Sequence, residues 1–165
     1  MAENNLHFAE LESKTDPTGF TTDTHLIVIR VVVVGKDVPT ADGPLGDNPK
    51  HVDGETYCYD LFKDGIWKQT FKDDSLRKLY AGEGMVFDPI KDKFIAAQPY
   101  ESWTIDENDD WQAPVPYPTI LEHGDPVREC VIYWDDDGGQ WESAFVEDPD
   151  TIFHWDASGL SWIAV

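Results

Sequence analysis

Positive charge is scarce in this sequence and almost missing from its C-terminal half. The chain has 12 Lys and Arg residues against 33 Asp and Glu residues, a formal net charge of −21. Residues 94–165 contain one basic residue, Arg128, and 16 acidic residues. Phosphate backbones and anionic lipid headgroups need Lys and Arg to neutralise them. The charge therefore argues against nucleic acids and membrane surfaces as partners. It is typical of a solvated surface, with a basic partner or mimicry of DNA as the alternatives.

Cysteines and long apolar runs are also scarce. Cys58 and Cys130 are too few for a disulfide scaffold, and the sequence alone leaves open whether they pair. We interpret both as buried thiols. The longest apolar run surrounds Val31–Val34 and is far shorter than a membrane span. Because Met1–Asn5 lacks the basic and apolar regions of a signal peptide, we expect no secretion signal.

Catalytic and metal-binding motifs are missing as well. The histidines have no spacing typical of a zinc site: His7, His25, His51, His123 and His154. There is no nucleophile elbow or phosphate-binding loop. The segment Asp106–Asp110 begins like an EF-hand loop, but Trp111 stands where that loop needs Gly and Tyr117 where it needs Glu. We expect no enzyme activity, no cofactor and no metal site, with a weak divalent site in an acidic turn as the alternative.

The N-terminal part is predicted to combine strands with one short helix. Leu6–Leu11 alternates apolar and polar residues, and Thr24–Val34 is so rich in β-branched residues that a central strand buried on both faces is favoured. Gly35–Asp53 is rich in Gly, Pro and Asp and is predicted to be a long loop. Ile66–Phe71 is predicted to be another strand, and residues 72–84 a connector with several basic residues.

A short helix is predicted between Asp53 and Gly65. Three apolar residues have helical spacing and would share one buried face: Cys58, Leu61 and Phe62. Asp53 is placed to cap the start of this helix and Gly65 to end it. The alternative is a hairpin that turns at Asp64–Gly65.

The aromatic residues recur in the most informative pattern of the sequence. Three times an aromatic–Asp pair is followed by a second aromatic residue six positions after the Asp: Phe87–Asp88 with Phe94, Trp134–Asp135 with Trp141, and Trp155–Asp156 with Trp162. A looser example runs from Trp103 to Trp111. Two proline-containing segments, Gln98–Tyr100 and Ala113–Pro118, are predicted to be extended links between these units.

Each repeat is predicted to be a β-hairpin in which two rings face each other across the strands. If Asp137–Gly138 forms a type I′ turn, Trp134 comes directly opposite Trp141. Such a ring pair contributes about 0.5–1.5 kcal/mol beyond area burial, which matters in a short hairpin. The Asp that follows the first ring can accept backbone N–H groups in the turn. In the last hairpin, Gly159 is suited to a left-handed position.

The expected fold is therefore mainly β, of the α+β class. Residues 1–84 are predicted to form an N-terminal α+β lobe, a small antiparallel sheet with one short helix. Residues 85–165 are predicted to form an acidic series of aromatic-clasped hairpins with Pro-rich links. Because residues 1–93 hold 11 of the 12 basic residues, we expect the N-terminal lobe to dock on a partner. Leu6–Leu11 is expected to be an edge strand that pairs with that partner.

Exposed Trp and Tyr side chains can also stack on sugar rings, so a carbohydrate-binding module is an alternative from another class. The candidates are Trp103, Trp111, Tyr117, Trp134, Trp141, Trp155 and Trp162. Cross-strand pairing already gives several of them a packing role, and aromatic side chains usually serve burial first. We therefore favour structural clasps over a ligand platform.

Several motifs, taken in order, resemble a family of small virion-associated structural proteins of marine tailed phages, cyanophages above all. They are His7–Leu11, the Val-rich strand, Trp67–Thr70, Arg77–Gly82, Phe87–Asp88 with Phe94–Pro99, Trp103–Pro114, and the terminal Trp155–Asp156 to Trp162 clasp. This chain departs from the family pattern in a longer loop at Gly35–Asp53 and in an insertion-like stretch, Leu121–Phe153. The resemblance supplies no catalytic residues.

The resemblance implies a structural role in a virion that is assembled in the host cytoplasm. We expect a capsid decoration or head-surface protein that binds the major capsid protein or another virion protein and can self-associate on the particle. A tail, collar or fibre-associated protein is the alternative within this class. A host-glycan binding module and an acidic decoy for a nucleic-acid-binding enzyme are the alternatives outside it.

Overall fold

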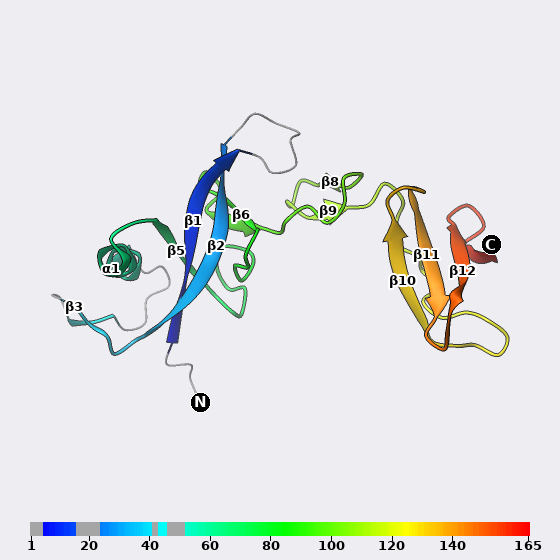
Figure 1. Ribbon diagram of the computed structural model, residues 1–165, viewed down its shortest axis with the longest axis horizontal. Helices are drawn as coiled ribbons and strands as arrows, with labels where there is room; N and C mark the ends of the chain where they lie inside the picture. The colour runs from blue at the N-terminus through cyan, green and yellow to red at the C-terminus, as the bar shows by residue number, and fades with distance from the viewer. Residues whose placement is uncertain (1–4, 16–23, 41–42, 46–51) are drawn as a thin grey trace. The chain divides into compact units, whose positions relative to one another are not determined.

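A computed structural model describes residues 5–15, 24–40, 43–45 and 52–165, and these form two compact units (Figure 1). The first unit is residues 1–97 and the second is residues 98–165. Both are built from antiparallel strands, and the described residues contain one helix, so the fold is mainly β as predicted. The boundary lies later than the predicted one at residue 84, because the hairpin of Phe87 and Phe94 pairs with the first unit's sheet.

The first unit is a five-stranded sheet in the order β5–β1–β2–β6–β7. Its strands are β1 (Asn5–Thr15), β2 (Thr24–Gly35), β5 (Ile66–Thr70), β6 (Val86–Asp88) and β7 (Lys93–Ile95). The prediction that Leu6–Leu11 is an edge strand is wrong, since β1 is paired with β2 on one side and with β5 on the other. Its buried residues instead form the centre of the sheet.

Two hydrophobic clusters cover opposite faces of β1, because successive side chains of a strand point to opposite faces. The cluster on one face consists of Leu6, Phe8, Val34, Leu45, Cys58 and Trp67. The cluster on the other face consists of Ala9, Leu11, Val28, Ala81, Phe87 and Phe94. Helix α1 supplies the cover on the first face, and the connector after β5 together with the β6–β7 hairpin supplies it on the second.

A β-bulge interrupts the pairing of β1 with β2. Glu10 pairs with Arg30, but the next residue, Leu11, pairs with Val28, so one residue of β2 is extra. The extra residue reverses which positions face each cluster, and the apolar pattern therefore loses its alternation. The predicted burial on both faces is wrong toward the C-terminal end of β2, where Val33 is 57% exposed.

The predicted helix is present as α1 (Val52–Phe62), and the alternative hairpin is not. It begins at Val52, so Asp53 lies inside the first turn and is not its N-cap. The residue directly after the helix is Lys63, and it has the left-handed conformation, with φ 63°. The prediction assigned the end of the helix to Gly65. Leu61 is 55% exposed and not in the core as predicted, because the helix turns Gly54 and Cys58 toward the sheet.

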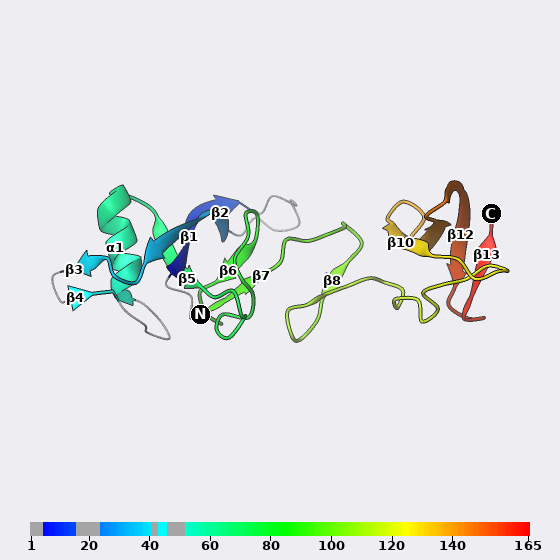
Figure 2. The same ribbon diagram turned by 90° about the horizontal axis from the view of Figure 1, so that it is seen from below.

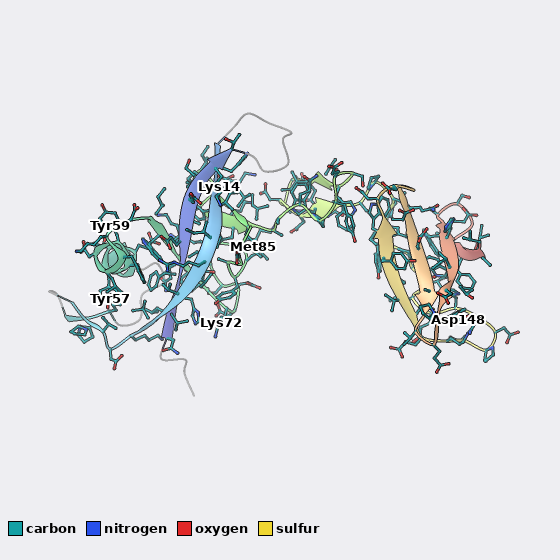
Figure 3. All side chains as sticks on the ribbon, viewed as in Figure 1. Lys14, Tyr57, Tyr59, Lys72, Met85 and Asp148 are labelled. Carbon is teal, nitrogen blue, oxygen red and sulfur yellow. The ribbon has the colours of Figure 1, made fainter. Side chains whose placement is uncertain are left out.

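The long loop before α1 contains a small ribbon. Its strands, β3 (Pro39–Thr40) and β4 (Gly43–Pro44), lie beside α1 (Figure 2), and Leu45 joins the cluster around Cys58. The rest of the predicted loop, residues 41–42 and 46–51, lies outside the described residues. Figure 3 shows Tyr57 and Tyr59 on different sides of α1: Tyr57 packs against the cluster, whereas Tyr59 is 52% exposed.

The second unit is a four-stranded antiparallel meander that follows a small hairpin. The meander consists of β10 (Cys130–Asp135), β11 (Gln140–Phe145), β12 (Asp148–Asp156) and β13 (Ser161–Ala164), paired in chain order. The small hairpin consists of β8 (Thr104–Ile105) and β9 (Trp111–Gln112). The hairpins predicted at Trp134 and Trp155 are therefore neighbouring parts of one sheet.

The three aromatic hairpins share one turn design. Phe87 pairs with Phe94, Trp134 with Trp141, and Trp155 with Trp162, with ring centroids 5.0, 5.2 and 5.2 Å apart. Each loop has four residues, and its last residue is left-handed: Asp92 (φ 50°), Gly139 (φ 64°) and Leu160 (φ 49°).

Two details of the predicted turns are wrong. Gly139, and neither Asp137 nor Gly138, has a positive φ, so the type I′ turn is not formed, and Leu160 takes the left-handed position expected of Gly159. The ring pairing is nevertheless as predicted, because loops of two and of four residues centred on the same point give the same register.

Candidate functional site

The meander of the second unit carries a row of tryptophans on one face, which we call the inner face. Trp134, Trp141, Trp155 and Trp162 come from the four successive strands, and the first three are buried. Ile132, Ser143 and Phe153 lie on the same face, two positions along their strands. The inner face is therefore the hydrophobic core of the second unit.

The Pro-rich segment covers the inner face and is held there by indole N–H groups. Trp141 donates its Nε1–H to the carbonyl of Val115 at 2.9 Å, and Trp162 donates to the carbonyl of Ile120 at 2.8 Å. Tyr117 packs edge-on against Trp141, with ring centroids 4.8 Å apart. A proline-rich chain presents free carbonyls because proline has no N–H, and aromatic grooves use this property to bind such chains. The segment thus packs against the tryptophans of its own unit.

The predicted clasp between Trp103 and Trp111 is wrong. Trp111 pairs with Ile105 in the β8–β9 hairpin. Trp103 instead packs edge-on against Trp134 and Trp141, at centroid distances of 6.4 and 5.9 Å. Trp103 and Trp111 are eight positions apart, against seven for the two rings of each of the other three hairpins, and this changes the pairing across the turn.

Asp136 fixes the start of the second unit to the meander. Its Oδ1 accepts hydrogen bonds from the hydroxyl of Ser102 and from Nε1–H of Trp134, the latter at 2.9 Å. These two donors hold the pKa of Asp136 below its usual value. Asp88 and Asp156 accept backbone N–H groups inside their own turns, as predicted for the Asp that follows the first ring. These carboxylates have structural partners.

His123 and Ser143 lie together on the inner face. His123 Nε2 lies 2.7 Å from Ser143 Oγ, and its ring packs against Phe145, Phe153 and Trp162. Burial among these rings, and next the charge of Arg128, lower the pKa of His123. Ser143 is fully buried, so its hydroxyl is closed to a substrate. The pair anchors the segment before β10 and does not resemble an accessible nucleophile.

The opposite face of the meander, which we call the outer face, carries two cross-strand rows. One row is mainly polar: Tyr133, Glu142, His154 and Ile163. In it, His154 Nε2 lies 3.0 Å from Glu142 Oε1. Burial, and next a hydrogen bond with Glu142, raise the pKa of Tyr133.

The second row of the outer face is entirely apolar. It runs across Val131, Ala144, Ile152 and Val165, the last joined to Ile152 by a backbone hydrogen bond of 3.2 Å. Val131 is 55% exposed, Val165 81%, and the adjacent Ile163 53%. We call these five apolar side chains, Val131, Ala144, Ile152, Ile163 and Val165, the outer strip.

In the first unit, Arg77 joins the two edge strands of the sheet. Its guanidinium donates to the carbonyl of Gln69 in β5 at 2.7 Å, and its own carbonyl accepts the N–H of Phe94 in β7 at 2.9 Å. Arg77 therefore links β5 and β7, the two edge strands of the sheet. Glu55 of α1 accepts from Arg77 at 2.8 Å and from the N–H of Gln69 at 2.9 Å, and Asp92 accepts from Arg77 at 2.9 Å.

The other chemistry-bearing groups do not converge. No set of three or more His, Cys, Asp or Glu side chains in the described part of the chain is arranged to hold a metal ion. Across the same described ranges, no helix is long and apolar enough to cross a membrane. Cys58 is buried as predicted, whereas Cys130 is partly exposed because it lies at the start of the sheet edge strand β10. Desolvation, with a smaller effect of Glu55, raises the pKa of Cys58 to about 12.

Sequence reasoning missed Arg77 and the outer strip. Arg77 lies in one of the motifs of the resemblance, but no local pattern indicates that it links β5 to β7. The outer strip did leave a signal, because Val131 and Tyr133 alternate with Ile132 and Trp134, the pattern of a strand with two different faces.

Comparison of the chain with protein-family models, with curated proteins and with solved structures found no match.

Proposed function

We propose that this protein is a non-enzymatic structural component of a tailed-phage virion, most consistent with a capsid decoration or head-surface protein. The supporting observation is where the phage-like motifs lie. Arg77 of Arg77–Gly82 links the edge strands β5 and β7, Phe87 and Phe94 lie in the core of the first unit, and Trp155 and Trp162 clasp the last hairpin. The resemblance therefore concerns residues that build the framework of each unit.

The electrostatic support for docking of the first unit on an acidic shell is weaker than the number of its basic residues suggests. Although this unit holds 11 of the 12 basic residues, four of them already contact acids of the same unit: Lys14 with Glu12, Arg30 with Glu10, Lys68 with Glu55, and Arg77 with Glu55 and Asp92. The second feature expected to support docking, a free sheet edge at Leu6–Leu11, is absent because β1 is paired on both sides.

The burial of the tryptophans weighs against the glycan-binding alternative. Trp134, Trp141 and Trp155 are buried, and the Pro-rich segment already packs against this cluster. A sugar ring would have to displace that segment before it could stack on these side chains. Titration with a host cell-surface polysaccharide should therefore leave the tryptophan fluorescence unchanged.

The proposal is tested by quantitative mass spectrometry of purified virions from the phage that encodes this chain. A decoration protein should be present in a copy number comparable to that of the major capsid protein, and it should co-sediment with emptied heads. A few copies per particle that sediment with tails would place it in the tail, collar or fibre. Absence from purified virions would refute the virion role.

A further inference from the structure

We infer that the outer strip of the second unit is a docking surface for a protein partner whose contact area is apolar and flanked by Lys or Arg. The inference deepens the proposed structural role. It rests on that proposal in assuming that the protein binds a partner, and it does not depend on location in a virion. It starts from the two different faces of the meander.

The two faces of the meander differ in how they are covered. The inner face is covered by residues of the same unit, among them Trp103, Ala113 and Val115. The outer face has an apolar row across all four strands, in which Val131 and Val165 are more than half exposed, Ile152 is partly exposed and Ala144 is buried. Ile163, in the adjacent row, is 53% exposed. An antiparallel sheet with one solvated face normally carries polar residues there. Exposed aliphatic side chains grouped on such a face are instead typical of an interaction site.

The charges around the outer strip specify the partner. Asp135, Glu142 and Asp156 lie on the outer face, and His154 is the group there that can become positive, already facing Glu142 at 3.0 Å. Arg128 is the one Lys or Arg of residues 98–165, and its guanidinium lies 3.4 Å from the ring centre of Phe145, an inner-face residue.

A second copy of this chain is a poor occupant of the outer strip. Residues 98–165 have a net charge of −15, so two such faces in contact would bring like charges within one screening length, about 8 Å at physiological salt. A basic surface gains from the same field, which also speeds its approach. The apolar strip then supplies contact area, and the surrounding acids supply orientation.

The test uses the full chain and two short peptides of equal length and equal Lys content. One is an amphipathic helix of Leu and Lys, and the other has Ser in place of every Leu. Calorimetric titration at physiological salt should show the Leu peptide binding at least about tenfold more tightly, because only it can cover the strip. Equal affinity for the two peptides, or no binding of either, would overturn the inference.

Substitutions locate the site without changing charge. The double variant Val131→Thr, Ile163→Thr keeps β-branched residues in the strands and should reduce the affinity for the Leu peptide by about tenfold. The matched control is Val146→Thr, in the turn before β12, where Val146 is 52% exposed but outside the strip. This control should stay within about twofold of the unchanged chain, whose affinity is the reference.

Two further results would contradict the assignment. An equal loss of affinity in the Val146→Thr control would place binding outside the outer strip. Self-association of the full chain in sedimentation, abolished by the double variant, would make a second copy the occupant. Failure of the virion proteomics leaves this inference standing, because the peptide titration does not depend on where the protein is found.

Discussion

Replacement of Arg77 by Met should break the link between the edge strands β5 and β7 of the first unit. The Arg77 side chain is 5% exposed and contacts Glu55 and Asp92, as well as the carbonyl of Gln69. Removal of one partner from a buried ion pair costs about 3–5 kcal/mol, and a buried carbonyl without a donor costs about 1–3 kcal/mol. Because these contributions overlap, we expect the free energy of unfolding of this unit to fall by about 4 kcal/mol.

Lys68→Met is the matched control for Arg77→Met. Lys68 binds the other oxygen of the same Glu55 carboxylate at 3.1 Å, but its side chain is 30% exposed and it does not link β5 to β7. Ion pairs that are reached by water contribute about 0–1 kcal/mol. Lys68→Met should therefore cost less than about 1 kcal/mol.

Hydrogen exchange measured by mass spectrometry distinguishes the two variants, because peptides report on each unit separately. Arg77→Met should reduce the protection of β1, β5 and β7 and leave β10–β13 unchanged. Equal loss of protection in Arg77→Met and Lys68→Met would refute the linking role of Arg77. Loss confined to the connector at residues 72–84, with the strands still protected, would refute it as well.

The remaining predictions concern turn strain, protonation and thiol reactivity. Leu160→Gly should stabilise the second unit by about 1 kcal/mol in urea unfolding followed by Trp fluorescence, because Leu160 is held at φ 49°, a strained position for a side chain with a Cβ. No gain would show that the strain is relieved by packing. The lowered pKa of His123 means that its neutral form is favoured in the folded state. Its contribution to stability should be present above pH 6.5, the unfolded value, and lost as the pH falls toward the lower folded value. The unfolding midpoint of the unchanged chain should thus fall more between pH 7.5 and about 5 than that of His123→Gln, and parallel curves would contradict this. At about pH 8, iodoacetamide should modify Cys130 before Cys58, whose pKa is raised to about 12, and rapid double labelling of the folded chain would show that Cys58 is not buried.

The sequence by itself determined the elements that depend on local pattern. The aromatic–Asp spacing placed Trp134 opposite Trp141 and Trp155 opposite Trp162, because the register of a hairpin depends only on residues within the hairpin. Helical spacing and flanking turn residues located α1 to within a residue or two. The concentration of Asp and Glu residues in the C-terminal half can be read directly from the sequence.

Local pattern failed where a partner comes from elsewhere in the chain. Trp103 and Trp111 have nearly the right spacing for a clasp, yet the surface formed by Trp134 and Trp141 offers Trp103 a larger apolar contact. Leu61 has the spacing of a core residue, but the direction in which α1 faces the sheet was set by Cys58.

Only the tertiary structure decided which strand lies at an edge, which basic residues are already paired, and which face of the meander stays uncovered. β1 becomes central because β5 arrives beside it from more than fifty residues later in the chain. Arg77 becomes the link between β5 and β7 because it bonds to Gln69 in one strand and to Phe94 in the other. Strand pairing and the burial of a sheet face depend on contacts between distant segments. A single sequence shows which residues are present but not which of them contact each other.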